Sequence, residues 1–160
     1  MDANTAGIVA AIGALVGAGA IVWQTRLTTR VQIFLQLVSR WDSTDMQQTR
    51  SYAAGCILNK QDFSPHVDDV LDFFETVAMF SKRKHLDDEI VWDTFYWPMA
   101  CYWCKTESYI REAQKDEGAE TWKGYSDVIP VLIDREGGEL PGAEAVDQFL
   151  NGELRRYRPQ

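Results

Sequence analysis

The chain has few basic side chains for its length and for the number of acidic ones. It holds 16 Lys and Arg against 24 Asp and Glu, which gives a formal net charge of -8 at pH 7. A nucleic-acid-binding protein needs a basic face to neutralise phosphates, so this balance argues against a nucleic-acid partner. Aromatic residues make up 12% of the chain, which is too many for a disordered acidic segment. One folded domain is therefore expected beyond the N-terminal region.

Cysteine and histidine are also scarce. Cys56, Cys101 and Cys104 are odd in number, which is unlike a disulfide framework and favours a reducing compartment. Cys101 and Cys104 form a C-x-x-C pair, a spacing found in redox sites and in half of a zinc site. Redox pairs usually follow a strand, however, and the spacing to Cys56, His66 and His85 matches no common zinc motif. We expect two buried, inert thiols and no cofactor, with a metal or redox protein as the third possibility.

Other catalytic patterns are missing from the sequence. Acidic residues cluster in two places, at Asp68, Asp69, Asp72 and Glu75 and at Asp87, Asp88 and Glu89. No Glu-x-x-His pair accompanies them, and no Ser, His and Asp grouping has a recognisable nucleophile signature. We expect these carboxylates to be caps and solvated faces, so the sequence predicts no enzyme and identifies no small-molecule substrate.

Charge is absent altogether from residues 6–23, "AGIVAAIGALVGAGAIVW", which are mostly Gly and Ala. A dinucleotide-binding loop would need a third glycine where Val22 stands, so that interpretation fails. A cleaved signal peptide fits poorly, because the preceding residues "MDANT" include no Lys or Arg. As a helix, eighteen residues rise about 27 Å, close to the thickness of a bilayer core. The sequence therefore predicts a single transmembrane helix.

The flanks of this segment predict its orientation. Trp23 stands where an interfacial aromatic residue is expected, and Arg26 and Arg30 come after it. Since positive charge lies on the C-terminal flank only, the positive-inside rule places the short N-terminus outside and residues 24–160 in the cytoplasm. The expected location is the bacterial inner membrane.

Small residues in the span predict helix packing within the bilayer. Gly13 and Gly17 form a G-x-x-x-G pair, and Ala6 and Ala10 extend the same face toward the N-terminus. Such faces allow close backbone approach between membrane helices. The expected partners are the lipid bilayer and other membrane-protein helices, including those of the same chain.

Apolar residues at helical spacing predict that the span continues into a helical bundle. The first face consists of Val31, Phe34, Leu35, Val38 and Trp41. Further helices are expected over 46–59, 64–84 and 86–115. The predicted inward residues are Met46, Thr49, Ala53 and Ile57 in the first of these and Val67, Val70, Leu71, Phe74, Val77 and Ala78 in the second. Residues 115–124 are expected to form a loop. Residues 125–134 are a short apolar segment whose secondary structure the sequence does not determine, and residues 143–158 form an amphipathic segment.

Particular residues indicate where these helices begin and where one of them is interrupted. Ser64 and Pro65 are typical of a helix start, as is Asp87 or Asp88 at the next one. Pro98 should kink or divide the helix that contains it.

A family resemblance rests on several of these residues. Trp41, Met46 and Arg50-x-Tyr52 precede "VLDFFETVAMFSKRKHLDDEIVWDTF" and an aromatic helix that contains "YW". Over residues 5–125 this arrangement resembles a family of uncharacterised bacterial and phage membrane proteins that share a domain of unknown function. The resemblance implies one N-terminal span and a small helical cytoplasmic domain, and it implies no activity. The chain departs from the pattern at Lys84-His85, where a glycine is common, and after residue 125.

The sequence thus predicts an all-α protein in which a single N-terminal transmembrane helix continues into a cytoplasmic helical bundle. We expect an anchor over 1–24, a helical domain over 25–125 and a C-terminal extension over 126–160. The predicted function is a membrane-anchored scaffold or accessory subunit of a membrane complex. An oligomeric pore or effector is the alternative, which the lack of polar residues in the span disfavours.

Overall fold

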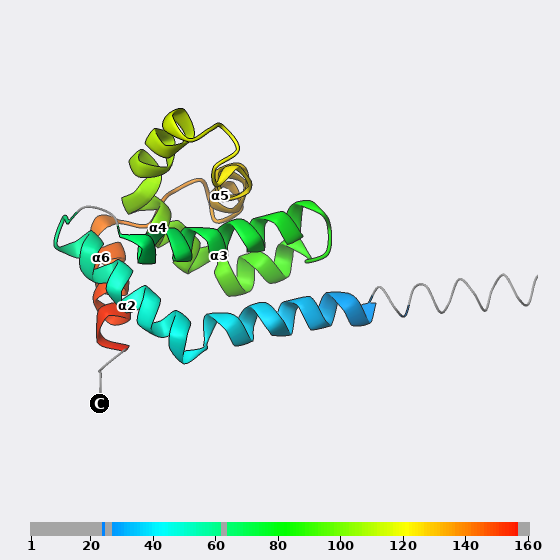
Figure 1. Ribbon diagram of the computed structural model, residues 1–160. Helices are drawn as coiled ribbons and strands as arrows, with labels where there is room; N and C mark the ends of the chain where they lie inside the picture. Colours follow the sequence, from blue (N-terminus) through cyan, green and yellow to red (C-terminus); the bar gives the residue numbers. More distant parts are fainter. Residues whose placement is uncertain (1–23, 25–26, 62–63, 157–160) are drawn as a thin grey trace, which may run out of the picture. The chain divides into compact units, whose positions relative to one another are not determined.

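A computed structural model describes residue 24 and residues 27–61 and 64–156, and over these residues the protein is all-α, as predicted. A helix over 27–41 is followed by α2 (Thr44–Leu58), α3 (Pro65–Lys82), α4 (Asp88–Asp116), α5 (Lys123–Arg135) and α6 (Ala143–Arg156) (Figure 1). The chain divides into two compact units, residues 1–36 and 37–160. No described helix is long and apolar enough to span a bilayer. The predicted span over 6–23 lies outside the described residues.

The helices of the second unit begin at the residues whose chemistry suits a helix start. Ser43 is the N-cap of α2, and its hydroxyl accepts a hydrogen bond from the Met46 N–H at 3.2 Å. Ser64 precedes α3 with Pro65 in the first turn, and the Asp87 carboxylate caps α4 by accepting from the Glu89 N–H at 2.9 Å. The Ser43 and Asp87 side chains satisfy donors that a helix leaves unpaired at its start, whereas the Ser64 side chain makes no cap hydrogen bond. The helix starts predicted from Ser64, Pro65 and Asp87 are confirmed.

α4 is one helix of 29 residues that runs through Pro98 without a break. Of the two outcomes expected at Pro98, a kink or a division, the division does not occur. Proline removes one backbone donor and crowds the preceding turn, which bends a helix more readily than it ends one when both halves are held by packing. Figure 1 shows α4 changing direction along its length. Pro98, Met99 and Ala100 are all buried, so tertiary packing surrounds the proline.

The core of the second unit lies around α3. All six residues of its predicted stripe are fully buried, as is Phe73, which the spacing argument left out. α2 packs against α3 and α6, and α5 packs against α3 and α4. The sequence did not determine the secondary structure of residues 125–134, which lie in helix α5. The buried face of α5 includes Tyr125, Ile129 and Leu132. Burial of this apolar area is the main favourable term in folding the unit.

The helix over 27–41 only partly matches its predicted apolar face. Trp41 stacks on Phe73 with ring centroids 4.9 Å apart, inside the second unit. Val31 and Leu35 are instead 56% and 57% exposed, and the buried residue of this segment is Leu37, at 5%. The sequence pattern identifies an apolar helix face correctly, but periodicity alone does not say what, if anything, covers it.

Candidate functional site

A buried charge cluster joins α2 to α6. Arg50 Nε lies 3.2 Å from Glu153 Oε2, and both side chains are almost completely buried. The Arg50 guanidinium carbon lies 3.9 Å from the centroid of the Trp41 ring, within cation–π range. The Tyr102 hydroxyl donates to the Arg50 carbonyl oxygen at 3.4 Å. Two residues that contribute to the family resemblance, Trp41 and Arg50, thus meet in one cluster.

Burial sets the electrostatics of this cluster. Desolvation lowers the pKa of Arg50 and raises the pKa of Glu153, while the attraction between the two charges opposes both shifts. The second Glu153 oxygen lies 3.2 Å from Arg156 Nε, on the exposed side. The 3.2 Å contact between Arg50 and Glu153 is an ion pair without hydrogen-bond alignment, and Arg50 Nη2 has no hydrogen-bond acceptor among the described residues. A pair of this kind fixes helix positions more than it adds stability.

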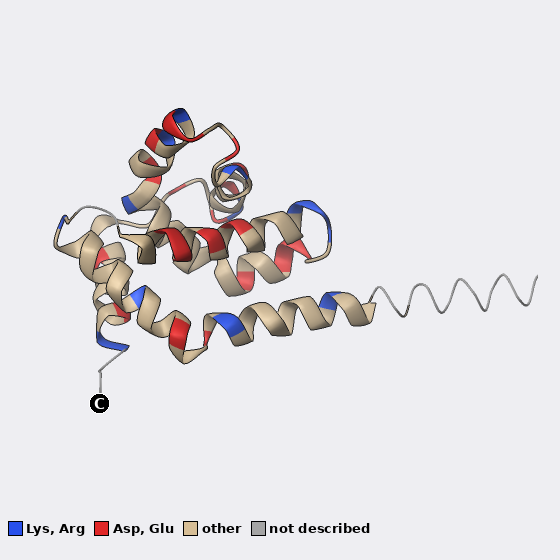
Figure 2. Ribbon diagram, viewed as in Figure 1, with Lys and Arg blue, Asp and Glu red and all other residues tan. Residues whose placement is uncertain are grey.

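The second polar assembly is the carboxylate row of α3, which consists of Asp68, Asp72 and Glu75. Figure 2 shows acidic positions along the ribbon of α3. Asp68 Oδ1 accepts from the Tyr109 hydroxyl at 2.7 Å, and Asp72 Oδ1 accepts from Trp122 Nε1 at 2.8 Å. Burial, followed by the bond to Asp68, raises the pKa of Tyr109. The three carboxylates lie three or four positions apart, so they share one face of the helix. The row connects α3 to the end of α4 and the start of α5.

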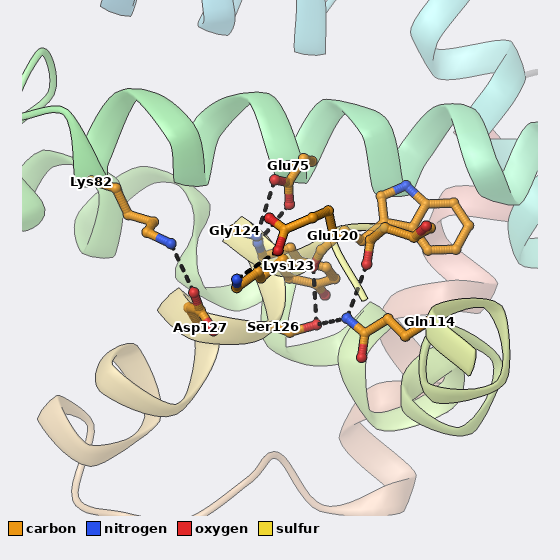
Figure 3. Close-up of polar contacts among 11 residues, drawn as sticks. Glu75, Lys82, Gln114, Glu120, Lys123, Gly124, Ser126 and Asp127 are labelled. Carbon is orange, nitrogen blue, oxygen red and sulfur yellow. Dashed lines mark hydrogen bonds and ion pairs between the residues drawn. The ribbon is translucent and has the colours of Figure 1, made fainter. Parts of the chain in front are cut away.

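Glu75 completes the row by capping α5 from outside the helix (Figure 3). Its two oxygens accept from the Gly124 N–H at 3.0 Å and from the Tyr125 N–H at 2.7 Å. The residue at the N-cap, Trp122, has φ 46° and supplies no side-chain cap of its own. A carboxylate at this end of the helix also suits the helix dipole. A Cβ on residue 124 would lie 2.6 Å from Glu75 Oε1, so this approach requires glycine.

A surface cleft lies beside this cap, lined by Glu75, Met79, Lys82, Arg83, Glu120, Lys123 and Gly124. Two of its cations are already paired with carboxylates. Lys82 Nζ lies 2.7 Å from Asp127 Oδ2, and Lys123 Nζ lies 2.8 Å from Glu120 Oε1 (Figure 3). The charges of the cleft are thus largely balanced within the protein.

The C-x-x-C thiols lie in the middle of α4. Cys101 is fully buried, and burial raises the pKa of its thiol to about 12. Cys104 is half-buried, and burial raises its pKa as well. A thiolate is the form that attacks or ligates, so both environments disfavour that chemistry at neutral pH. Across the part of the chain that the structure describes, no three His, Cys, Asp or Glu side chains are grouped to hold a metal ion.

The residues predicted for membrane packing and for the membrane interface fall mostly outside the described part. Ala6, Ala10, Gly13 and Gly17, with Trp23 and Arg26, lie there. Arg30 is described, and it is exposed on the helix over 27–41.

Sequence reasoning missed the Arg50–Glu153 pair, although a signal was present. Glu153 lies at helical spacing after Val146 and Leu150 on the buried stripe of α6. Arg50 likewise lies one turn after Met46 on the buried side of α2. A charged residue on each of two apolar stripes indicates a buried ion pair, because an unpaired buried charge is costly.

Comparison with known proteins identifies the family of the chain. The chain belongs to the family described as a domain of unknown function (DUF4760), whose model matches residues 5–129. This agrees with the resemblance to an uncharacterised family drawn over residues 5–125. No curated protein and no solved structure matches the chain. α6, and with it Glu153, lies beyond the matched residues.

Proposed function

We propose that this member of the DUF4760 family is a single-pass protein of the bacterial inner membrane that acts as a scaffold or accessory subunit of a membrane complex, and not as an enzyme. In this proposal residues 6–23 cross the bilayer with the N-terminus outside, and residues 24–160 lie in the cytoplasm. The bilayer and membrane-protein helices are its partners.

The observation that carries the proposal is the apolar surface next to the uncharged run. Leu27, Val31 and Leu35 are 41%, 56% and 57% exposed on one helix, shortly after residues 6–23 and between Arg26 and Arg40. Exposed apolar side chains grouped on one helix are typical of an interaction surface. The position of Arg26 and Arg30 after the uncharged run supports a cytoplasmic location for residues 24–160.

The environments of the acidic residues and the thiols in the second unit support a role in association and not in catalysis. Its acidic residues in α3 accept hydrogen bonds from Tyr109, Trp122 and the start of α5. The thiols of Cys101 and Cys104 have raised pKa values, which disfavours nucleophilic chemistry. These groups therefore have structural explanations that require no reaction.

The test of the proposal is a fractionation followed by proteolysis, on the full chain with a C-terminal tag. The chain should stay in the membrane pellet after alkaline carbonate extraction. Protease should leave the tag intact in spheroplasts and remove it in inverted membrane vesicles. Release by carbonate, tag loss in intact spheroplasts, or a mature N-terminus near Ile21 would each contradict the proposal.

A further inference from the structure

We propose that the surface of α2 and α4 beneath α6 is a binding site for an acidic amphipathic helix of a partner protein, and that α6 competes for this site as an internal ligand. The docking face, as we call this surface, includes Arg50 and Ser51 of α2 and Tyr102 and Lys105 of α4, each of which contacts α6 (Figure 1). The proposal concerns the second unit alone, so it goes beyond the proposed membrane anchor and does not depend on it.

The docking face presents two cations to two acidic residues of α6. Arg50 Nε lies 3.2 Å from Glu153 Oε2, and Lys105 Nζ lies 2.7 Å from Asp147 Oδ1. Leu150, which is fully buried, lies midway between the two acids in the sequence. This spacing places all three on one side of a helix. The docking face therefore fits a helix with the pattern acidic-x-x-large apolar-x-x-acidic.

The remaining contacts are ones that another helix could make. The Ser51 hydroxyl donates to the Leu154 carbonyl oxygen at 3.1 Å. That carbonyl lies in the last turn of α6, where carbonyl groups have no acceptor role left within the helix. The rings of Tyr102 and Phe149 meet edge to face with centroids 6.0 Å apart. A helix held by apolar anchors and by its own backbone matches the helix-in-groove mode of peptide recognition.

Charge decides which partner helix fits. Arg50 is almost completely buried, and Glu153 is the carboxylate beside it. An occupant without an acidic group at this position would leave a buried cation without a counter-ion, which is costly. A basic occupant would add repulsion from Arg50 and Lys105. The occupant must therefore supply an acidic side chain where α6 supplies Glu153.

α6 is held by a small buried surface. Its buried residues are Val146, Leu150 and Glu153, whereas α3 has buried residues along its whole length. One of the three in α6 is charged, and desolvation of a buried ion pair offsets much of the attraction between its members. When α6 leaves the docking face, Arg50 and Glu153 both regain water. Elements held by few buried apolar contacts are the ones that open at low cost.

The segment before α6 allows this helix to leave without unfolding α5. Residues 136–140 are exposed. The N–H groups of Gly137 and Gly138 donate to the carbonyl oxygens of Asp134 and Ile133 at 3.2 and 2.9 Å, so they complete the end of α5. Both glycines have positive φ, 115° and 82°, which glycine adopts without strain. The end of α5 is therefore formed by its own residues and not by contacts with α6.

The experiment measures binding of a fluorescein-labelled peptide, with the sequence of residues 141–156, to the full chain purified in detergent. Leu150→Asp in the chain places a charge at a fully buried position of α6 and should release this helix from the docking face. Fluorescence anisotropy should show the peptide binding to Leu150→Asp at least about tenfold more tightly than to wild type, because a tethered helix competes at a high effective concentration.

Two variant peptides of equal composition and charge provide the matched control. Glu153→Lys places a cation against Arg50, whereas Glu144→Lys changes an exposed residue in the first turn of α6. Glu153→Lys should weaken binding to the Leu150→Asp chain several-fold more than Glu144→Lys does. Adding Lys105→Glu to the Leu150→Asp chain should also weaken binding of the unmodified peptide. Equal affinities of the two variant peptides would overturn the proposed charge recognition.

Folding of the opened chain is verified by circular dichroism and urea unfolding. If Leu150→Asp does not fold, a thrombin site inserted between Gly137 and Gly138 of the folded wild-type chain separates α6 by cleavage instead. Excess labelled peptide should then replace the cleaved helix. Absence of peptide binding to the opened chain, or equal binding to the opened and wild-type chains, would overturn the proposal.

Native-state hydrogen exchange of the wild-type chain tests the release of α6 directly. The amides of α6 should exchange before those of α3, as a group. Exchange of α6 only at the rate of global unfolding would show that the helix is not a displaceable ligand. Wild-type dimers that are lost with Glu153→Lys would identify the α6 of a second copy as the occupant, which would overturn the partner helix.

Discussion

The helix over 27–41 and helix α3 use their surfaces in opposite ways. Three acidic residues of α3 are engaged within the protein, because Asp68, Asp72 and Glu75 each accept hydrogen bonds from α4, α5 or the segment between them. In the helix over 27–41 even apolar residues such as Val31 are left largely exposed. A polar group that is hydrogen-bonded within the protein has a structural role, whereas an exposed apolar side chain is available to contact a partner. The carboxylates of α3 therefore have structural roles, whereas the helix over 27–41 has exposed apolar side chains.

The largest effect should come from breaking the buried charge pair of the second unit. Glu153→Gln leaves the buried Arg50 without its counter-ion, so we expect a loss of about 3 to 5 kcal/mol in the free energy of unfolding. Urea unfolding followed by circular dichroism measures this loss. Glu144→Gln, on the exposed first turn of the same helix, is the matched control and should change stability little. Equal urea unfolding midpoints for Glu153→Gln and Glu144→Gln would mean that the buried ion pair contributes nothing to stability.

The next effect concerns the cap that Glu75 provides to α5. Gly124→Ala places a Cβ against the Glu75 carboxylate and displaces it from two backbone donors, for a loss of about 0.5 to 2 kcal/mol. Gly152→Ala is the control, since its Cβ would meet no other atom within 4 Å. Because alanine favours helix, that change should be neutral or stabilising by up to about 1 kcal/mol.

A double-mutant cycle sharpens this prediction. If Gly124→Ala acts by displacing Glu75, then combining it with Glu75→Ala should cost less than the sum of the two single losses. Additive losses would show that the glycine matters for another reason. The unfolding midpoints of the four proteins in the cycle provide the measurement.

A smaller effect should appear in the pH dependence of stability. Hydrogen bonds from Lys84 and then Ser81 lower the pKa of Asp88. A carboxyl group with a lowered pKa in the folded state stabilises it above its unfolded pKa, and this contribution is lost as the pH falls. Asp88→Asn should therefore cost a few tenths to about 1 kcal/mol near neutral pH, since the pair is half exposed. The difference in unfolding free energy between Asp88→Asn and wild type should shrink below about pH 4. A difference that grows there would contradict the lowered pKa of Asp88.

The smallest effect on stability is expected in the N-terminal helix. Val31→Gln removes an exposed apolar side chain without altering the core of the second unit, so its unfolding free energy should change by less than about 0.5 kcal/mol. Urea unfolding followed by circular dichroism measures this change. A large loss of stability from Val31→Gln would break the comparison between the two helices, because it would mean that this face is already covered within the chain.

The all-α class, the position of α3 and the helix starts at Ser64 and Asp87 could be predicted from the sequence alone. These features obey local rules, namely periodicity and the satisfaction of helix ends, which depend on residues close together in the chain. The secondary structure of residues 125–134 stayed open at that level because their apolar run is short and includes Pro130. The effect of Pro98 was also beyond local rules, since packing around the proline decides between a bend and a break.

The structural roles of the polar residues follow from the packing of the helices and not from local sequence. Glu75 and Gly124 are 49 positions apart, and Ser51 and Leu154, which share a hydrogen bond between α2 and α6, are 103 apart. No spacing rule connects such residues, because the packing of the helices brings them together. The same holds for the apolar face of the N-terminal helix: its pattern is local and visible in the sequence, but whether the chain itself covers Val31 depends on the arrangement of all the other helices.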